Sequence, residues 1–197
     1  MATRWSSGER PDASDYDARW EALAAAGADP HGEASFVASL QPGSVFDAGC
    51  GTGRVAIELA RRGIEVVGVD LDSDFIEHAR RKAPTIDWRH ADLATVDLAR
   101  TFDVVVAAGN VMIFLTPGTE GIVLENFARH LAPGGHVVTG FQLLPGRLKL
   151  AEFDRLAGRA GLTVIDRFST WSADPYDGGD YAVSVLVATD TAVPGTH

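Results

Sequence analysis

Three glycines at alternate positions, Gly49, Gly51 and Gly53, directly follow a short apolar run and precede a helical pattern. Glycine has no Cβ atom and adopts positive φ, so the chain can reverse tightly here and a bound molecule can approach the backbone. The amide groups at the start of the following helix then face that molecule and favour a negative group such as a carboxylate. The sequence therefore predicts a strand, a ligand-binding turn and a helix over residues 44–62.

Apolar strands and amphipathic helices continue to alternate after this turn. The predicted strands are Ser44–Gly49, Ile64–Asp70, Ile86–Arg89, Asp103–Ala108 and His136–Phe141, and the predicted helices are Thr52–Arg62, Ser73–Ala83, a helix opened by Thr116 and Pro117, and Lys149–Ala160. Leu162–Ser169 and Tyr181–Thr189 alternate apolar and polar residues and predict an antiparallel pair of strands. Alternation that ends in such a pair predicts an α/β fold with an open, doubly wound sheet.

A separate helical segment precedes the sheet. Tyr16 and Trp20 share one face of a helix predicted near Asp15–Ala26, and Asp29–Pro30 is predicted to start a second helix that ends near Leu40. Aromatic residues at this spacing usually indicate core packing, but a segment in this place can also cover the carboxyl edge of the sheet, where ligands bind. We therefore divide the chain into a helical lead-in or lid at 1–43, a cofactor-binding domain at 44–190 and a tail at 191–197.

The charge balance restricts the partners of the protein. Acidic residues outnumber basic ones 27 to 17, for a formal net charge of −10, whereas nucleic-acid binding needs clustered Lys and Arg. The single cysteine, Cys50, excludes an internal disulfide and a cysteine-built metal site. No apolar run reaches the roughly 18–20 residues of a membrane helix. We expect a cytoplasmic monomer or homodimer with no metal, no nucleic-acid partner and no membrane partner.

The glycine spacing distinguishes between two classes of cofactor. A dinucleotide-binding turn follows the pattern G-x-G-x-x-G, and counted from Gly49 its third glycine position holds Arg54. A nicotinamide-dependent oxidoreductase on the same fold is therefore a disfavoured alternative.

The segment D-A-G-C-G-T-G at 47–53 resembles motif I of the class I S-adenosylmethionine-dependent methyltransferases. Later segments resemble further motifs of that family in order: Gly68-Val69-Asp70, Ala91-Asp92-Leu93, Phe102–Val106 and Leu131–Gly135. The resemblance implies a seven-stranded Rossmann-like sheet in the order 3-2-1-4-5-7-6, mostly parallel with a C-terminal antiparallel strand. It also implies S-adenosylmethionine as cofactor, S-adenosylhomocysteine as product, and methyl transfer to a small-molecule acceptor by in-line displacement.

The resemblance assigns roles to three acidic residues. Asp47 orders the turn and receives the ammonium group of the cofactor, Asp70 grips both ribose hydroxyls, and Asp92 accepts a hydrogen bond from the exocyclic amine of adenine. An acid at the end of a buried strand is costly without hydrogen-bond donors, which independently favours a ligand-linked role for Asp47 and Asp70. Tyr16 and Arg19 are predicted lid contacts to the cofactor's carboxylate. The remaining predicted cofactor residues are Ala48, Gly49, Cys50, Gly51, Gly53, Arg54, Leu71, Ala91, Leu93, Ala108, Gly109 and Asn110.

Catalytic residues carry a weaker signal, because the sulfonium already contains a good leaving group and the enzyme mainly aligns the reactants and excludes water. Asn110 leaves the fourth predicted strand where acceptors meet the methyl group, and its amide can orient an acceptor by hydrogen bonding. His90, at the carboxyl end of the third strand, is the second candidate, although an ordinary surface histidine is as common in such a place.

The predicted acceptor pocket lacks a helical insertion that commonly forms part of such pockets. The segment Gln142–Leu148 is too short for the helical insertion that many small-molecule methyltransferases carry there. The walls are therefore expected from the lead-in and from loops around Asn110, Phe114, Gln142 and residues 171–176. The main alternative function is a non-catalytic sensor or scaffold that binds S-adenosylmethionine without turnover.

Overall fold

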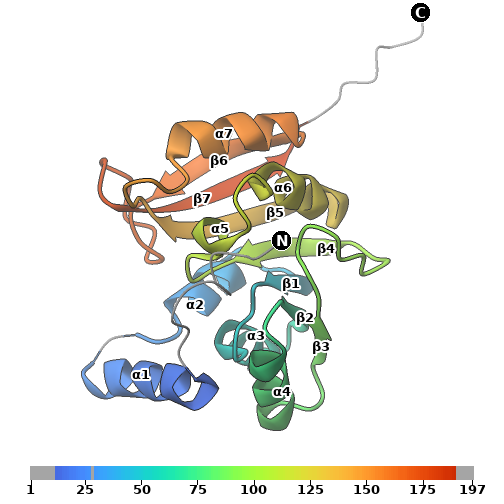
Figure 1. The fold of residues 1–197 in the computed structure, drawn as a ribbon, viewed down its shortest axis with the longest axis vertical. Coiled ribbons are helices and arrows are strands. Elements are labelled where there is room, and N and C mark those ends of the chain that lie inside the picture. The colour runs from blue at the N-terminus through green and yellow to red at the C-terminus, as the bar shows by residue number, and fades with distance from the viewer. Residues whose placement is uncertain (1–11, 28, 190–197) are drawn as a thin grey trace, which may run out of the picture.

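The computed structural model describes residues 12–27 and 29–189, so the tail predicted at 191–197 lies outside the described residues. Seven strands form one sheet in the order β3-β2-β1-β4-β5-β7-β6 (Figure 1), which confirms the predicted topology. The strands are β1 (Ser44–Ala48), β2 (Glu65–Asp70), β3 (Asp87–His90), β4 (Phe102–Ala107), β5 (Leu131–Gln142), β6 (Leu162–Phe168) and β7 (Tyr181–Ala188). The helices are α1 (Ala13–Ala25), α2 (Gly32–Ser39), α3 (Arg54–Arg61), α4 (Ser73–Lys82), α5 (Val111–Phe114), α6 (Glu120–Arg129) and α7 (Leu150–Arg159).

Two apolar layers hold the helices on opposite faces of the sheet. One layer joins α5, α6 and α7 to the sheet, and the ring of Phe46 on β1 lies 5.7 Å from that of Phe102 and 6.1 Å from that of Phe127. The other layer joins α2, α3 and α4 to the opposite face through residues such as Val37 and Leu59, both fully buried. The strands between these layers are apolar on both sides, as expected for parallel strands covered by helices.

The central strand β1 pairs in parallel with β2 on one side and β4 on the other. Asp47 lies opposite Gly68 of β2 and Val106 of β4. Because parallel strands all end at the same edge, the loops after β1, β2, β3 and β4 meet there. This carboxyl edge holds every predicted cofactor-binding segment of the sheet.

The prediction that Thr116 and Pro117 open a helix is wrong. Helix α6 begins at Glu120, and Thr116 accepts a hydrogen bond from the Thr119 amide at 3.0 Å in a turn that precedes the helix. Gly118 has φ of +85°, which lies outside the right-handed helix and prevents an earlier start.

Other boundaries also differ from the predicted ones. β5 begins at Leu131 instead of His136, because the Pro133–Gly135 turn forms an irregularity inside the strand, where the register with β4 shifts. α2 begins at Gly32, since the Asp29 carboxylate accepts the His31 amide at 2.8 Å and holds a preceding turn. The short helix α5 was not predicted.

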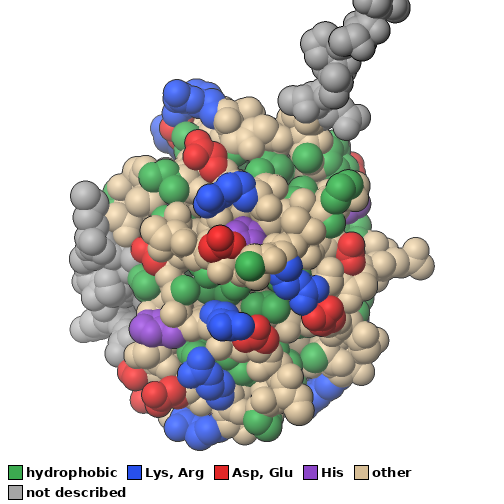
Figure 2. Space-filling model, turned by 90° about the vertical axis from the view of Figure 1, so that its right-hand side faces the viewer, with side chains coloured by type: hydrophobic (Ala, Val, Ile, Leu, Met, Phe, Trp, Pro, Cys, Tyr) green, Lys and Arg blue, Asp and Glu red, His purple; other side chains and the backbone are tan. Residues whose placement is uncertain are grey.

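Charged side chains are mixed in sign over the face shown in Figure 2, where Lys and Arg alternate with Asp and Glu. The face in view therefore carries no continuous basic stripe of the kind that binds a phosphate backbone. Within residues 12–27 and 29–189, no helix combines the length and the apolar character needed to cross a membrane.

A pair of glycine substitutions tests the packing around the β5 irregularity. A Cβ at Gly135 would lie 2.7 Å from the Asp103 carbonyl oxygen, whereas one at Gly158 in α7 meets nothing within 4 Å. We expect Gly135→Ala to lower the free energy of unfolding by about 1–3 kcal/mol, because backbone cannot move aside cheaply. Gly158→Ala should raise it by about 0.5–1 kcal/mol, since alanine favours a helix. Urea titrations measure both, and equal effects would contradict this account.

Candidate functional site

The glycine turn between β1 and α3 has a left-handed backbone at all three glycines. The φ angles of Gly49, Gly51 and Gly53 are +79°, +56° and +87°. A Cβ at Gly49 would lie 2.4 Å from the Val111 side chain, and one at Gly53 would lie 2.5 Å from the ring of Trp88. Backbone conformation and packing therefore both require glycine at positions 49 and 53. At Gly51 a Cβ would meet only Phe75, at 3.7 Å.

Asp70 at the end of β2 holds the same turn. Its carboxylate accepts hydrogen bonds from the Gly51 amide and from the Asp72 amide, each at 2.8 Å. Burial raises the pKa of Asp70, and these two amide donors act against that rise. A carboxylate offers about four lone-pair sites, so Asp70 retains acceptor capacity for the hydroxyl groups of a ligand.

Asp47 at the end of β1 is 2% exposed and accepts a hydrogen bond from the Ala56 amide in the first turn of α3 at 3.1 Å. Burial raises its pKa to about 7, although the attraction of Arg54 opposes the rise. A buried carboxyl group with few donors is costly to ionise, and a cationic ligand group beside it would favour the charged form.

The third acid lies in a different environment. Asp92 is exposed and its carboxylate accepts the Ala94 amide at 2.9 Å, so the side chain stabilises the turn after β3. Leu93 beside it is buried, whereas Leu71 after β2 is 38% exposed. The exposed Leu71 side chain is thus an apolar surface at the carboxyl edge, directly after β2.

The two predicted catalytic residues do not form one cluster. A ring nitrogen of His90 lies 3.0 Å from the Leu71 carbonyl oxygen, which ties His90 to the segment after β2. Asn110 follows β4, and three strand spacings separate β3 from β4 in the sheet, a distance of about 14 Å. His90 therefore lies on the Asp70 side of the site and not beside Asn110.

Asn110 joins the carboxyl ends of β4 and β5. Its side-chain oxygen accepts the Gln142 amide at 2.8 Å, and its side-chain nitrogen lies 3.5 Å from the Gln142 side-chain oxygen. Its backbone has φ of +72°, and it follows Gly109 at +65°. This conformation turns the chain sharply at the end of β4 and fixes both amide side chains at the carboxyl edge.

The lead-in helices contact the glycine turn directly. The Arg54 guanidinium pairs with both Glu33 oxygens on α2, at 2.8 and 2.5 Å, and lies 3.8 Å from the ring centre of Trp20 on α1. The predicted cofactor role of Arg54 is thus left to its backbone, because its side chain binds the lead-in. Sequence patterns gave no signal for Glu33, an acidic helix residue that proves to be 7% exposed.

The side chains of α1 occupy three different environments. The ring of Tyr16 lies 5.5 Å from that of Phe75 at the start of α4, and Arg19 is exposed. The indole nitrogen of Trp20 is buried without a hydrogen-bond partner in the described part of the chain. An unpaired buried N–H group is costly, so this nitrogen is a candidate donor to a ligand.

The β6–β7 loop and the start of β7 place two aromatic side chains over β5. The sequence predicted a pocket wall at residues 171–176, which include Trp171, but not at Tyr181. Trp171 donates from its indole nitrogen to the Tyr181 hydroxyl at 3.0 Å, and its ring packs edge-on against that of Phe36 on α2 at 5.7 Å. Both aromatic side chains cover Gly140 of β5, where a Cβ would lie 2.4 Å from Trp171 and 2.7 Å from the Tyr181 hydroxyl. Burial raises the pKa of Tyr181 to about 12, so its phenol stays protonated.

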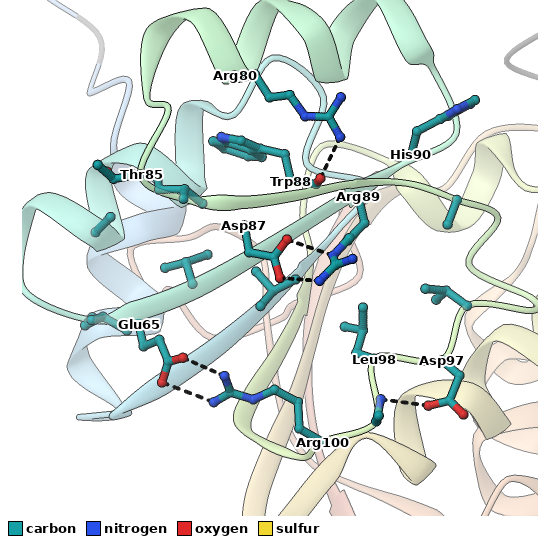
Figure 3. Close-up of a pocket in the computed structure, with 18 of the residues that line it drawn as sticks. Glu65, Arg80, Thr85, Asp87, Trp88, Arg89, His90, Asp97, Leu98 and Arg100 are labelled. Carbon is teal, nitrogen blue, oxygen red and sulfur yellow. Dashed lines mark hydrogen bonds and ion pairs between the residues drawn. The ribbon is translucent and has the colours of Figure 1, made fainter.

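A groove of about 1000 Å³ runs along the outer edge of β3 (Figure 3). Two of its arginines form ion pairs, Arg89 with Asp87 at 2.7 Å and Arg100 with Glu65 at 2.5 Å. Arg80 donates to the Trp88 carbonyl at 2.8 Å. Such charged pairs suit the protection of an edge strand. Of the residues that line the groove, only His90 and Ala91 are among the predicted site residues. Among the described residues, no group of three or more His, Cys, Asp or Glu side chains has the geometry of a metal site.

Comparison with known proteins identifies relatives of the whole fold. A family model described as a methyltransferase domain matches residues 45–135. The solved structure of a TehB-like SAM-dependent methyltransferase from Corynebacterium glutamicum is 36% identical and superposes with a TM-score of 0.83, covering 90% of this chain and 98% of its own.

Two curated relatives match shorter segments. The dTDP-3-amino-3,4,6-trideoxy-alpha-D-glucopyranose N,N-dimethyltransferase of Streptomyces venezuelae is 32% identical over 57% of this chain and 50% of its own length. The magnesium-protoporphyrin O-methyltransferase of Rhodobacter capsulatus is 36% identical over 41% of this chain and 38% of its own length. The matched segments thus span half or less of these relatives.

The raised pKa of Asp47 predicts a pH dependence of stability. Its folded pKa of about 7 lies above the value of about 3.9 for an unfolded aspartate. Between these values the folded protein binds more protons, so stability falls as pH rises and levels off above about pH 7.

In the wild type, Asp47 should lower the free energy of unfolding by an amount on the order of a few kcal/mol between pH 5 and 8. We expect Asp47→Asn to remove this part of the decline. The raised pKa of Asp70 should leave a residual slope of the same sign. Denaturant titrations across this range measure the effect, with the exposed Asp177→Asn as control. Identical slopes in wild type and Asp47→Asn would contradict the assignment.

Proposed function

The chain belongs to the class I S-adenosylmethionine-dependent methyltransferases, and we propose that it transfers a methyl group from S-adenosylmethionine to a small-molecule acceptor. The observation that carries the proposal is the glycine turn held between two acids, the buried Asp47 and the half-buried Asp70, at the ends of adjacent parallel strands. The space beside Gly51, where a Cβ would meet only Phe75 at 3.7 Å, lets a ligand approach the turn, and the two carboxyl groups match a ligand that carries both a cation and hydroxyl groups.

The described residues fit each part of the cofactor. We place the ammonium group at Asp47, the ribose hydroxyls on the free acceptor positions of Asp70, and the adenine against Leu71 and Leu93, with Asp92 at its exocyclic amine. The carboxylate would face the amides at the start of α3, where a helix N-terminus favours a negative group. The remaining predicted backbone contacts come from Ala48, Cys50, Gly53, Ala91 and Ala108.

The lead-in supplies the outer side of the cofactor site. The unpaired indole nitrogen of Trp20 supports a hydrogen bond to the cofactor's carboxylate, beside the proposed contacts of Tyr16 and Arg19. We therefore treat residues 1–43 as a lid and residues 44–190 as the domain that carries the cofactor.

The bound cofactor supplies an activated methyl group, and the protein's own residues must align the acceptor and exclude water. Asn110 and Gln142 present amide groups at the edge where β4 and β5 end. Trp171 and Tyr181 form a wall, and the phenol of Tyr181 acts as a hydrogen-bond donor because its raised pKa keeps it protonated. The two curated relatives are named as an N- and an O-methyltransferase, which supports a small acceptor with a nitrogen or oxygen nucleophile.

Calorimetry with S-adenosylhomocysteine tests the cofactor site. Loss of hydrogen bonds to a charged group costs about 1.5–3 kcal/mol, so Asp70→Ala should weaken binding roughly 10- to 150-fold. The exposed Asp87→Ala on β3 is the control and should bind like wild type. Because Asp70 also holds Gly51, circular dichroism must show a folded variant. Equal affinity in Asp70→Ala and wild type would refute the ribose contact, and no binding to wild type would refute the proposed function.

A methyl-transfer assay separates the enzyme from the alternative of a non-catalytic sensor. Radiolabelled S-adenosylmethionine is incubated with metabolite fractions, and labelled products are collected. An enzyme forms a methylated product, whereas a sensor binds the cofactor and transfers nothing.

The role of Asn110 is best tested by Asn110→Gly, because glycine accepts the left-handed backbone and removes only the amide side chain. We expect kcat to fall about 10- to 100-fold, since misplacement by about 1 Å can cost 10²-fold, while affinity for S-adenosylhomocysteine stays within about twofold. Gln142→Ala should give a smaller loss, because the 2.8 Å bond to Asn110 comes from the Gln142 backbone amide and remains, while only the 3.5 Å side-chain contact is removed. An unchanged kcat in Asn110→Gly would exclude Asn110 from acceptor alignment.

A further inference from the structure

Asp17 on α1 joins three separate elements at the cofactor edge. Its carboxylate accepts a hydrogen bond from the Thr52 hydroxyl in the glycine turn at 2.5 Å. The same carboxylate pairs on α4 with Lys82 at 2.6 Å and with His78 at 2.9 Å. A single side chain of the lead-in thus links α1, the glycine turn and α4.

The position of Thr52 makes this contact important for the turn. Thr52 is fully buried and lies between Gly51 and Gly53, whose left-handed conformations set the direction of the turn's peptide groups. Asp70 holds the Gly51 amide from inside the sheet, and Asp17 holds the Thr52 hydroxyl from the lead-in side. Two carboxylates, one from β2 and one from α1, therefore fix adjacent residues of the turn.

Asp17 is well suited to a charged contact of this kind. Burial opposes its ionisation, but the bonds from Lys82 and Thr52 outweigh burial and lower the pKa of Asp17. The ionised form is thus the one that the fold stabilises, and hydrogen bonds to a charged group are roughly twice as strong as neutral ones.

The packing of α1 does not rest on Asp17 alone. Tyr16 contacts Phe75, and Trp20 stacks on Arg54. Figure 1 shows α1 on the side of α3 and α4, in agreement with these contacts. Loss of the Asp17 carboxylate should therefore alter the turn and the fit of α1 without unfolding the domain.

We propose that Asp17 is a positioning residue of the cofactor site. Acting through Thr52, it holds the glycine turn in its ligand-facing conformation and keeps α1 against the turn, so that it sets how long the cofactor stays bound. This inference rests on the proposed function, because it assumes that S-adenosylmethionine and S-adenosylhomocysteine occupy the turn.

The test measures the dissociation rate of S-adenosylhomocysteine by stopped-flow fluorescence in the full chain. We expect Asp17→Asn and Thr52→Val each to raise this rate about tenfold, which corresponds to about 1.4 kcal/mol for one charge-assisted hydrogen bond. Thr52→Ser keeps the hydroxyl and should restore a rate close to that of wild type. Asp15→Asn, at an exposed position of the same helix, is the matched control and should dissociate like wild type.

A double variant tests whether Asp17 acts on the glycine turn through Thr52 or only by weakening the packing of the lead-in. If Asp17 acts through Thr52, Asp17→Asn combined with Thr52→Val should dissociate no faster than either single variant. Additive effects, or single variants with wild-type rates, would overturn the proposal while cofactor binding itself still supports the proposed function. Absence of S-adenosylhomocysteine binding to the wild-type chain would overturn both.

Discussion

The hydrogen bond from the Gly51 amide to the Asp70 carboxylate is the contact on which the arrangement of the site depends. It joins the end of β2 to the turn after β1 at 2.8 Å, and it can form only because β1 and β2 are parallel neighbours that end at the same edge. The turn needs such external support, because three left-handed residues within five positions gain little from regular hydrogen bonding. The Val69 carbonyl supplies further support by accepting the amides of Gly49 and Cys50 at 2.8 and 3.0 Å.

Local sequence patterns predicted most strands correctly, because each pattern depends only on the residues of its own segment. Apolar runs such as 103–108 mark buried strands, and the glycine spacing at 49–53 marks the turn. The family resemblance then supplied the strand order, which single segments cannot give. The turn at Gly118 and the irregularity inside β5 were not predicted, because both depend on how the chain fits against neighbouring elements.

The side chains of the site were harder to predict than its backbone. Arg54 follows the turn in sequence, yet its guanidinium is held by Glu33 and Trp20 from the lead-in. His90 and Asn110 both end strands, and only the sheet order shows how far apart they lie. Helix periodicity likewise cannot show that an acidic residue such as Asp17 contacts a buried threonine 35 positions away.

The glycine at position 140 has a consequence for how this fold can diversify. Its missing side chain is replaced by Trp171 and Tyr181, which arrive from the distant β6–β7 connection. The side chains that cover the β5 side thus come from the last third of the sequence, whereas the glycine turn and its acids come from the first half. If the proposed assignment of the site holds, changes to the later segment alter the acceptor side while the glycine turn and its acids stay the same. Acceptor choice and cofactor binding could then evolve as separate traits.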